Sequence, residues 1–199
     1  MLKRGIGEFG TDVYGRTAEQ FEVVGFAWTE EEAAAADDDG LIADGACKTT
    51  EVTIEPDEGA KMPCARNVVA KSAGTAGDIK AVAVTVYGKD IAGNDISEEL
   101  PKFTADSATT VTGNKAFAEV TKIVVPGMDG NGAKVKLGWG SKLGLPMRFD
   151  ANLVLAALHN GARESTAPTV AVDKDNVSGN TVTLNTTLNG KAVEVYCIA

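Results

Sequence analysis

Short runs of alternating apolar and polar residues, separated by turn-forming residues about every 8–12 positions, extend over most of this chain. The clearest run is residues 80–87, where Val82, Val84 and Val86 fall on one face. Residues 88–95 then have the composition of a hairpin loop, and residues 96–100 return as the partner strand. No long helical patterns alternate with these runs, which disfavours a parallel α/β sheet. The pattern therefore predicts an all-β, antiparallel sandwich or barrel.

The composition agrees with that fold class. Hydrophobic residues make up 44% of the 199 residues but aromatic residues only 6%, so alanine and valine carry most of the apolar content. The 22 glycines suit strands joined by tight turns. The length suffices for one large domain or two small ones with a substantial core.

The first forty residues predict an N-terminal unit with three parts. Residues 1–20 are rich in glycine and polar residues and predict an extended arm carrying Phe9 and Tyr14. Residues 21–28 predict a short strand. Thr29 and Glu32 then have the spacing of a capping box ahead of an alanine run, which predicts one short, exposed helix ending near Gly40. The acidic residues of that run are interpreted as a solvated face, with an acidic docking or cation-binding surface as the alternative.

The remainder divides into a β-sandwich domain over residues 41–147 and a C-terminal β-segment over residues 148–199. The segment is expected either to complete the sandwich or to form a small second unit. Asn160-Gly161 favours a strand–turn–strand over a short helix, and Asn189-Gly190 is a second hairpin candidate.

A glycine-rich stretch over residues 127–147 separates the two β-like parts and superficially resembles a phosphate-binding loop. Ala133 stands where such a loop needs lysine, and the following residues predict a strand and not a helix. Leu143 occupies the position of the third glycine in a dinucleotide-binding motif, and no βαβ context surrounds it. The stretch is therefore interpreted as a turn, a strand and a loop carrying Trp139. The glycines beside Trp139 allow close backbone approach, and Trp139 is either an interface anchor or a core residue.

The sequence predicts no enzyme, no cofactor and no metal site. Residues 129–132 and 173–176 lack the spacing of a calcium loop, and turns use the same residue types. His159, the sole histidine, has no nucleophile signature around it and is interpreted as a surface residue. The acidic residues gather in turns and in the acidic run, which indicates solvation more than a catalytic carboxylate pair.

Charge and cysteine usage narrow the environment of the protein. A formal net charge of −9 disfavours nucleic acid as a direct partner. The N-terminus lacks the apolar run of a signal peptide, and no stretch is apolar enough to span a membrane, so no membrane partner is expected.

The three cysteines, Cys47, Cys64 and Cys197, have the spacing of neither a disulfide framework nor a zinc site. A reducing compartment is the simplest interpretation, and a bridge between two of them stays open.

The middle of the chain resembles a β-module of virion structural proteins from tailed bacteriophages. The residues that carry the resemblance are Arg66 and Asn67 at a strand start, the hairpin over residues 88–98, the strand start over residues 113–117, and the closing segment over residues 138–146. The resemblance covers about 40% of the chain, residues 63–146. It implies an immunoglobulin-like or related sandwich in a decoration protein or another minor structural component.

The resemblance leads to specific functional expectations. The leading hypothesis is a capsid decoration protein that is made in the host cytoplasm, binds the assembled shell on the virion surface and stabilises it. Its partners would be the major capsid protein and copies of itself, in a trimer or another ring. Its expected protein contacts are Phe9, Tyr14, Trp139, Leu143 and Leu145. The alternatives are a tail tube or head–tail joining subunit that forms rings, and an extracellular binding module.

Overall fold

A computed structural model describes residues 4–6 and 22–198, and in these ranges the chain is all-β without an α-helix. The strands are β1 (Arg4–Ile6), β2 (Glu22–Trp28), β3 (Asp37–Ala46), β4 (Val52–Ile54), β5 (Arg66–Gly74), β6 (Thr85–Lys89), β7 (Asp95–Glu99), β8 (Thr110–Phe117), β9 (Glu119–Val125), β10 (Ala133–Gly144), β11 (Val154–His159), β12 (Ala162–Arg163), β13 (Thr169–Ala171), β14 (Thr181–Thr183) and β15 (Val193–Ile198). Two single 3₁₀ turns, Ala76–Asp78 and Val177–Gly179, complete the described elements.

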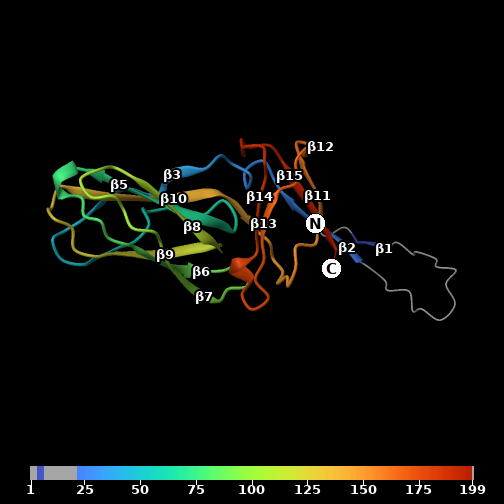
Figure 1. Cartoon of the computed structure of the whole chain (residues 1–199), viewed down its shortest axis with the longest axis horizontal. Coiled ribbons are helices and arrows are strands. Elements are labelled where there is room, and N and C mark those ends of the chain that lie inside the picture. Colours follow the sequence, from blue (N-terminus) through green and yellow to red (C-terminus); the bar gives the residue numbers. More distant parts are fainter. Residues whose placement is uncertain (1–3, 7–21, 199) are drawn as a thin grey trace.

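The strands form three antiparallel sheets, which confirms the all-β and antiparallel part of the predicted fold class. The first sheet has the order β1-β2-β15-β11-β12, and the third has the order β4-β9-β6-β7. The second has the order β13-β14-β10-β5-β8, with β3 as an additional partner of β10. Figure 1 shows an elongated molecule, with the third sheet beside β3, β5, β8 and β10 at one end and the first sheet beside β13 and β14 at the other.

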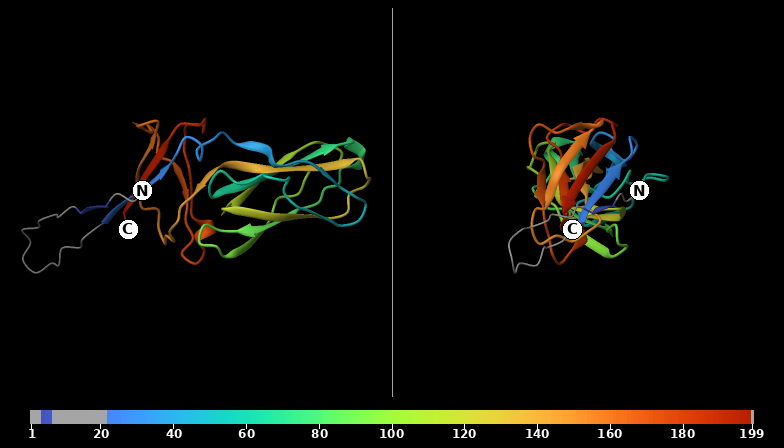
Figure 2. Two further views of the ribbon diagram at one scale, coloured as in Figure 1. Left: turned by 180° about the vertical axis from the view of Figure 1, so that it is seen from behind. Right: turned by 90° about the vertical axis from the view of Figure 1, so that its right-hand side faces the viewer.

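The described residues form two hydrophobic cores, which define two units. The core of the large unit lies between the third sheet and β3, β5, β8 and β10, and includes Phe117, Ile123 and Leu137. The core of the small unit lies between the first sheet and β14, and includes Trp28, Val182 and Val195. The left view of Figure 2 shows the two units end to end, and the right view looks along the long axis.

Strand β10 is the one strand of the described chain that contributes residues to both cores. Its first half places Ala133, Val135 and Leu137 in the large core, and its end places Leu143 in the small core. One edge of β10 pairs first with β3 and then, from Leu143 on, with β14. The other edge pairs with β5. The glycine-rich stretch expected to end in a loop is therefore mostly a long central strand, because neighbours on both edges satisfy its backbone.

The short helix predicted after Thr29 is wrong. The capping-box contacts do form, since the Thr29 amide donates to the Glu32 carboxylate at 2.7 Å and the Glu32 amide donates to Thr29 Oγ1 at 3.3 Å. Only one turn follows, and the three aspartates enter strand β3. Pairing with β10 overrides the helix propensity of the alanine run, since an isolated short helix has a costly nucleus. Lys71 and Lys136 bind Asp38 and Asp39 at 2.7 and 2.8 Å across this sheet.

The two Asn-Gly predictions have different outcomes. Asn160 and Gly161 adopt φ angles of 52° and 73° between β11 and β12, so the strand–turn–strand prediction is confirmed. Asn189-Gly190 is not a hairpin, because the preceding strand β14 and the following strand β15 belong to different sheets. Gly190 has a φ of 76° and donates its amide to Ala33 O at 3.0 Å, so the segment is a crossing between sheets. The hairpin formed by β6 and β7 is confirmed.

The two units divide the chain differently from the expected domains. Residue 40, the expected boundary, lies inside β3. Strand β2, expected in an N-terminal unit, pairs with β15 over Val23–Trp28 and contributes to the small core. The C-terminal segment thus forms the small unit together with β2 and the end of β10.

In the described ranges no helix is long and apolar enough to cross a bilayer.

Candidate functional site at the junction of the two units

Arg66 and Asn67 begin strand β5 between two irregular neighbours. Between its pairs with Val68 and Arg66, β10 runs from Trp139 to Leu143 and so bulges at Gly140–Lys142. On the other side, β8 bulges in the same way between its pairs with Val69 and Asn67. The side-chain amide of Asn67 bridges both bulges. Its Nδ2 donates to Gly113 O at 3.1 Å, and its Oδ1 accepts from the backbone N–H of Lys142 at 2.9 Å. One buried side chain thereby replaces the missing ladder bonds on both sides.

The Arg66 side chain is fully buried at the same level. Its guanidinium donates to Ala34 O at 2.7 Å and to Gly140 O in β10. No carboxylate within the described ranges pairs with it, and its Nε lacks an acceptor. Burial lowers the pKa of Arg66 to about 10, so the group stays charged at neutral pH. Arg66 therefore ties the connection between β2 and β3 to the bulge in β10, and so ties one unit to the other.

The β8 bulge is closed from its outer side by Glu98 of β7. The carboxylate accepts the amide of Asn114 at 2.6 Å and the amide of Lys115 at 3.1 Å. Lys142 Nζ donates to Asn114 Oδ1 at 2.6 Å and links this bulge to the one in β10. The β6–β7 hairpin is thereby joined to the second sheet.

Replacing Glu98 with alanine is expected to lower the free energy of unfolding by about 1–3 kcal/mol, because two backbone amides lose a charged acceptor. Urea denaturation followed by circular dichroism measures this loss. Glu99→Ala, at an exposed position of the same strand, is the matched control and should change stability by less than about 0.5 kcal/mol. Equal effects of the two substitutions would contradict the assigned role of Glu98.

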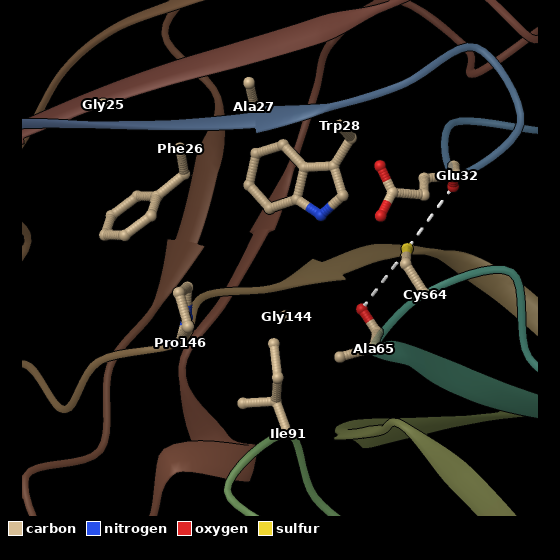
Figure 3. Close-up of a pocket in the computed structure, with 10 residues that line it drawn as sticks. All are labelled: Gly25, Phe26, Ala27, Trp28, Glu32, Cys64, Ala65, Ile91, Gly144 and Pro146. Carbon is tan, nitrogen blue, oxygen red and sulfur yellow. Dashed lines mark hydrogen bonds between the residues drawn. The ribbon is translucent and has the colours of Figure 1, made fainter. Parts of the chain in front are cut away.

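A pocket of about 200 Å³ opens beside this junction (Figure 3). Strand β2 forms one wall, with Phe26 and Trp28 pointing into the space. Ile91, from the loop between β6 and β7, lies on the opposite side, and Pro146 after β10 lies between them. Glu32, Cys64, Ala65 and Gly144 complete the lining with Gly25 and Ala27. The pocket thus lies between the two units and is lined by both.

Two polar groups of this pocket are incompletely paired in the described part of the chain. The indole N–H of Trp28 has no hydrogen-bond acceptor there, and in Figure 3 it faces the space between β2 and Gly144. The carboxylate of Glu32 accepts the Thr29 amide but pairs with no cation. An apolar pocket with a few convergent polar groups is the usual form of a binding site. This pocket is the candidate functional site.

The Cys64 thiol in this pocket is a poor nucleophile. Its Sγ lies 3.3 Å from Glu32 O, as drawn in Figure 3. Burial raises the pKa of Cys64 to about 12, and the pKa values of Cys47 and Cys197 to about 11. The three cysteines are free thiols, so no bridge joins any two of them. Their arrangement indicates packing and not thiolate chemistry.

The native thiols are expected to react with a disulfide reagent at pH 8 at least about a hundredfold more slowly than after unfolding, because the folded state holds them protonated.

The raised pKa values of the three thiols also mean that the folded state binds more protons than the unfolded state above about pH 9. Stability should therefore fall as the pH rises from about 9 toward 11. Thiol titration and urea midpoints at pH 7, 9 and 10.5 measure both effects, and fast native labelling would contradict the burial of these groups.

The structure separates the residues predicted as protein contacts. Leu143 and Leu145 are 0% and 1% exposed in the small core, so neither presents a surface to a partner in this fold. Trp139 is half-buried on β10, packs against the large core and donates its indole N–H to Ala35 O at 3.0 Å. It is a strand residue and not a loop residue, which corrects the expected loop. Phe9 and Tyr14 lie outside the described residues.

Sequence reasoning missed the pocket because its parts come from distant segments. The sequence predicts a strand at Trp28 and a capping box at Glu32, and the structure confirms both locally. Nothing in the sequence places Ile91, about sixty residues later, beside them.

The carboxylates of Asp37, Asp38 and Asp39 also lie within 4.8 Å of one another, but Lys71 and Lys136 already neutralise two of them.

Comparisons of the chain with protein-family models, with curated proteins and with solved structures find no match.

Proposed function

We propose that this chain is a virion structural protein of a tailed bacteriophage, and specifically a decoration protein that binds the assembled capsid and stabilises it. In this proposal it is made in the host cytoplasm, occupies the capsid surface, and contacts the major capsid protein and copies of itself in a trimer or another ring. It acts by binding and not by catalysis. Protein that binds the mature shell in many copies stabilises that shell by mass action.

The proposal rests on one observation: the four segments that resemble virion structural proteins meet in the folded structure. Asn67 bonds to Gly113 and to Lys142, so three of the segments meet at one side chain. Glu98, in the hairpin segment, closes the β8 bulge at Asn114. The residues that carry the resemblance thus form one contiguous framework. This supports a shared architecture with those proteins and a building role for the motif.

The two-sided core of the large unit supports a finer proposal for its fold. A four-stranded sheet faces β3, β5, β8 and β10 across that core, and the strands of both layers are antiparallel. We assign this arrangement to the immunoglobulin-like or related sandwiches. The small unit would then be an addition that positions the sandwich on its partner.

Co-sedimentation with particles of the phage that encodes the chain tests the proposal. Purified protein is mixed separately with empty capsids that lack it and with isolated tails, and pelleted protein is quantified. Saturable binding to capsids and not to tails is expected, together with a higher temperature of capsid disruption. Binding to tails alone, or assembly of the free protein into tubes or rings seen by negative-stain microscopy, would favour a tail tube or head–tail joining subunit and overturn the decoration role.

A further inference from the structure

The pocket between the two units is built from three complementary features. Phe26, Trp28 and Pro146 supply apolar surface, Trp28 supplies an N–H donor without an acceptor, and Glu32 supplies a carboxylate without a cation in the described ranges. The indole N–H needs an acceptor, from water or from a partner, and the carboxylate, which already accepts the Thr29 amide, attracts a cation. Together they define the chemistry of an occupant.

The opposite side of the pocket is held rigidly. Ile91 is 46% exposed at the tip of the β6–β7 loop, an unfavourable position for a large apolar side chain. The loop beneath it is fixed by Asp90, whose carboxylate accepts the amides of Ala92 and Asn94 at 2.9 Å each and the Asn94 side-chain amide at 3.1 Å. Asp90 itself is 5% exposed. The fold thus displays Ile91 in one position toward β2, as Figure 3 shows.

We infer that this pocket docks an extended segment of a partner protein in which an apolar side chain is followed by a lysine or arginine. The apolar side chain lies between Ile91 and the aromatic residues of β2. A backbone carbonyl of the segment accepts the Trp28 indole N–H, and the basic side chain pairs with Glu32. The volume of about 200 Å³ holds one aliphatic side chain with part of its backbone.

Charge complementarity selects this occupant. The carboxylates of Glu31 and Glu32 lie in the turn that borders the pocket, and neither pairs with a cation among the described residues. The one buried cation nearby, Arg66, is bound to Ala34 O and Gly140 O and does not line the pocket. A basic segment is therefore attracted and an acidic one repelled. The identification of the partner with the capsid shell rests on the proposed function, whereas the chemistry of the pocket does not.

The test uses three capped tetrapeptides, Gly-Leu-Lys-Gly, Gly-Leu-Glu-Gly and Gly-Ser-Lys-Gly, titrated into the full ¹⁵N-labelled chain. The first is expected to bind with a dissociation constant of about 1 mM and to shift the Trp28 indole N–H and the amides of Gly25, Cys64 and Ile91. The other two peptides should bind at least about threefold more weakly. Shifts elsewhere, no shifts, or equal binding of the three peptides overturns the inference.

Three substitutions at two positions sharpen the test without disturbing the fold. Glu32→Gln keeps an oxygen for the Thr29 amide but removes the charge, and should weaken binding of the lysine peptide about two- to fivefold. Ile91→Ser should abolish it, whereas the conservative Ile91→Val should retain it. If the same amides shift with protein concentration in the absence of peptide, a second copy of the chain occupies the pocket and the inference is overturned.

The capsid experiment separates the two proposals. Peptide binding without capsid binding would remove the decoration role and leave the pocket assignment in place. Capsid binding that Ile91→Ser and Glu32→Gln leave unchanged would preserve the decoration role and overturn the docking assignment to this pocket.

Discussion

Replacing Arg66 with alanine is expected to lower the free energy of unfolding by about 3–5 kcal/mol, because the loss of hydrogen bonds from a charged donor adds to the loss of buried packing. The side chain is fully buried, and its removal deprives Ala34 O and Gly140 O of a donor. It also leaves a void between the two units, which adds a cavity term. Urea denaturation followed by tryptophan fluorescence measures the loss, since Trp28 and Trp139 lie in different units.

Two further variants distinguish the contribution of the hydrogen bonds from that of packing. Arg66→Met fills much of the volume but cannot donate, and should lose about 1–3 kcal/mol for the two unsatisfied carbonyls. Lys71→Ala, which removes a half-exposed ion pair with Asp38 from the same strand, should lose about 1 kcal/mol or less. An Arg66→Ala variant no less stable than Lys71→Ala would show that the guanidinium does not hold the junction.

Replacing Gly138 with alanine is expected to lower the free energy of unfolding by about 3 kcal/mol or more, because the new methyl group has no space. A Cβ at this position would lie 2.0 Å from Asp37 O, a backbone atom of β3. Strand β3 can avoid the clash only by moving away from β10, which breaks the pairing around Trp139 and Asp37. Thermal and urea unfolding of the variant measure the effect.

Gly77→Ala is the matched control, since a Cβ there meets nothing within 4 Å and the residue has no positive φ. It should change stability by less than about 0.5 kcal/mol. Hydrogen exchange adds a local readout: amides of β3 should lose protection in Gly138→Ala, while amides of β6 and β9 should keep it. A wild-type melting curve for Gly138→Ala would refute the close approach of the two strands.

Local sequence patterns predict the strands in which buried and exposed residues alternate. Val84, just before β6, and Val86, within it, alternate with half-buried or exposed residues. The Asn160-Gly161 pair adopts the turn that its residues favour. The glycines beside Trp139 were expected to allow close backbone approach, and Gly138 does so against β3. These signals depend on neighbours within a few positions, so the sequence contains them directly.

Long-range pairing decided the elements that the sequence did not predict. The alanine run after Thr29 has helix propensity, yet Ala33 is fully buried in the small core and the following aspartates pair with β10. Propensity is a weak prior against that burial. The glycine-rich surroundings of Leu143 and Leu145 predict contacts with a partner, but β10 continues through Leu143 and both side chains lie in the second core.

The candidate site was beyond sequence reasoning for a related reason. Arg66 and Asn67 begin an ordinary strand by composition, and their roles arise from bulges in β8 and β10 that have no sequence signature. Ile91 and Trp28 come together because the small unit is built from both ends of the described chain. A pocket between units requires the packing of those units, which a local pattern does not encode.

The passage of β10 through both cores has a mechanical consequence. A load applied to the small unit reaches the large unit through the connection between β2 and β3 and along β10, which has antiparallel neighbours on both edges. Separation of the units would require shearing a row of hydrogen bonds at once, whereas two domains joined by a flexible linker would simply extend. Part of any tension along the long axis is therefore carried by β10 itself, and the molecule is expected to resist extension.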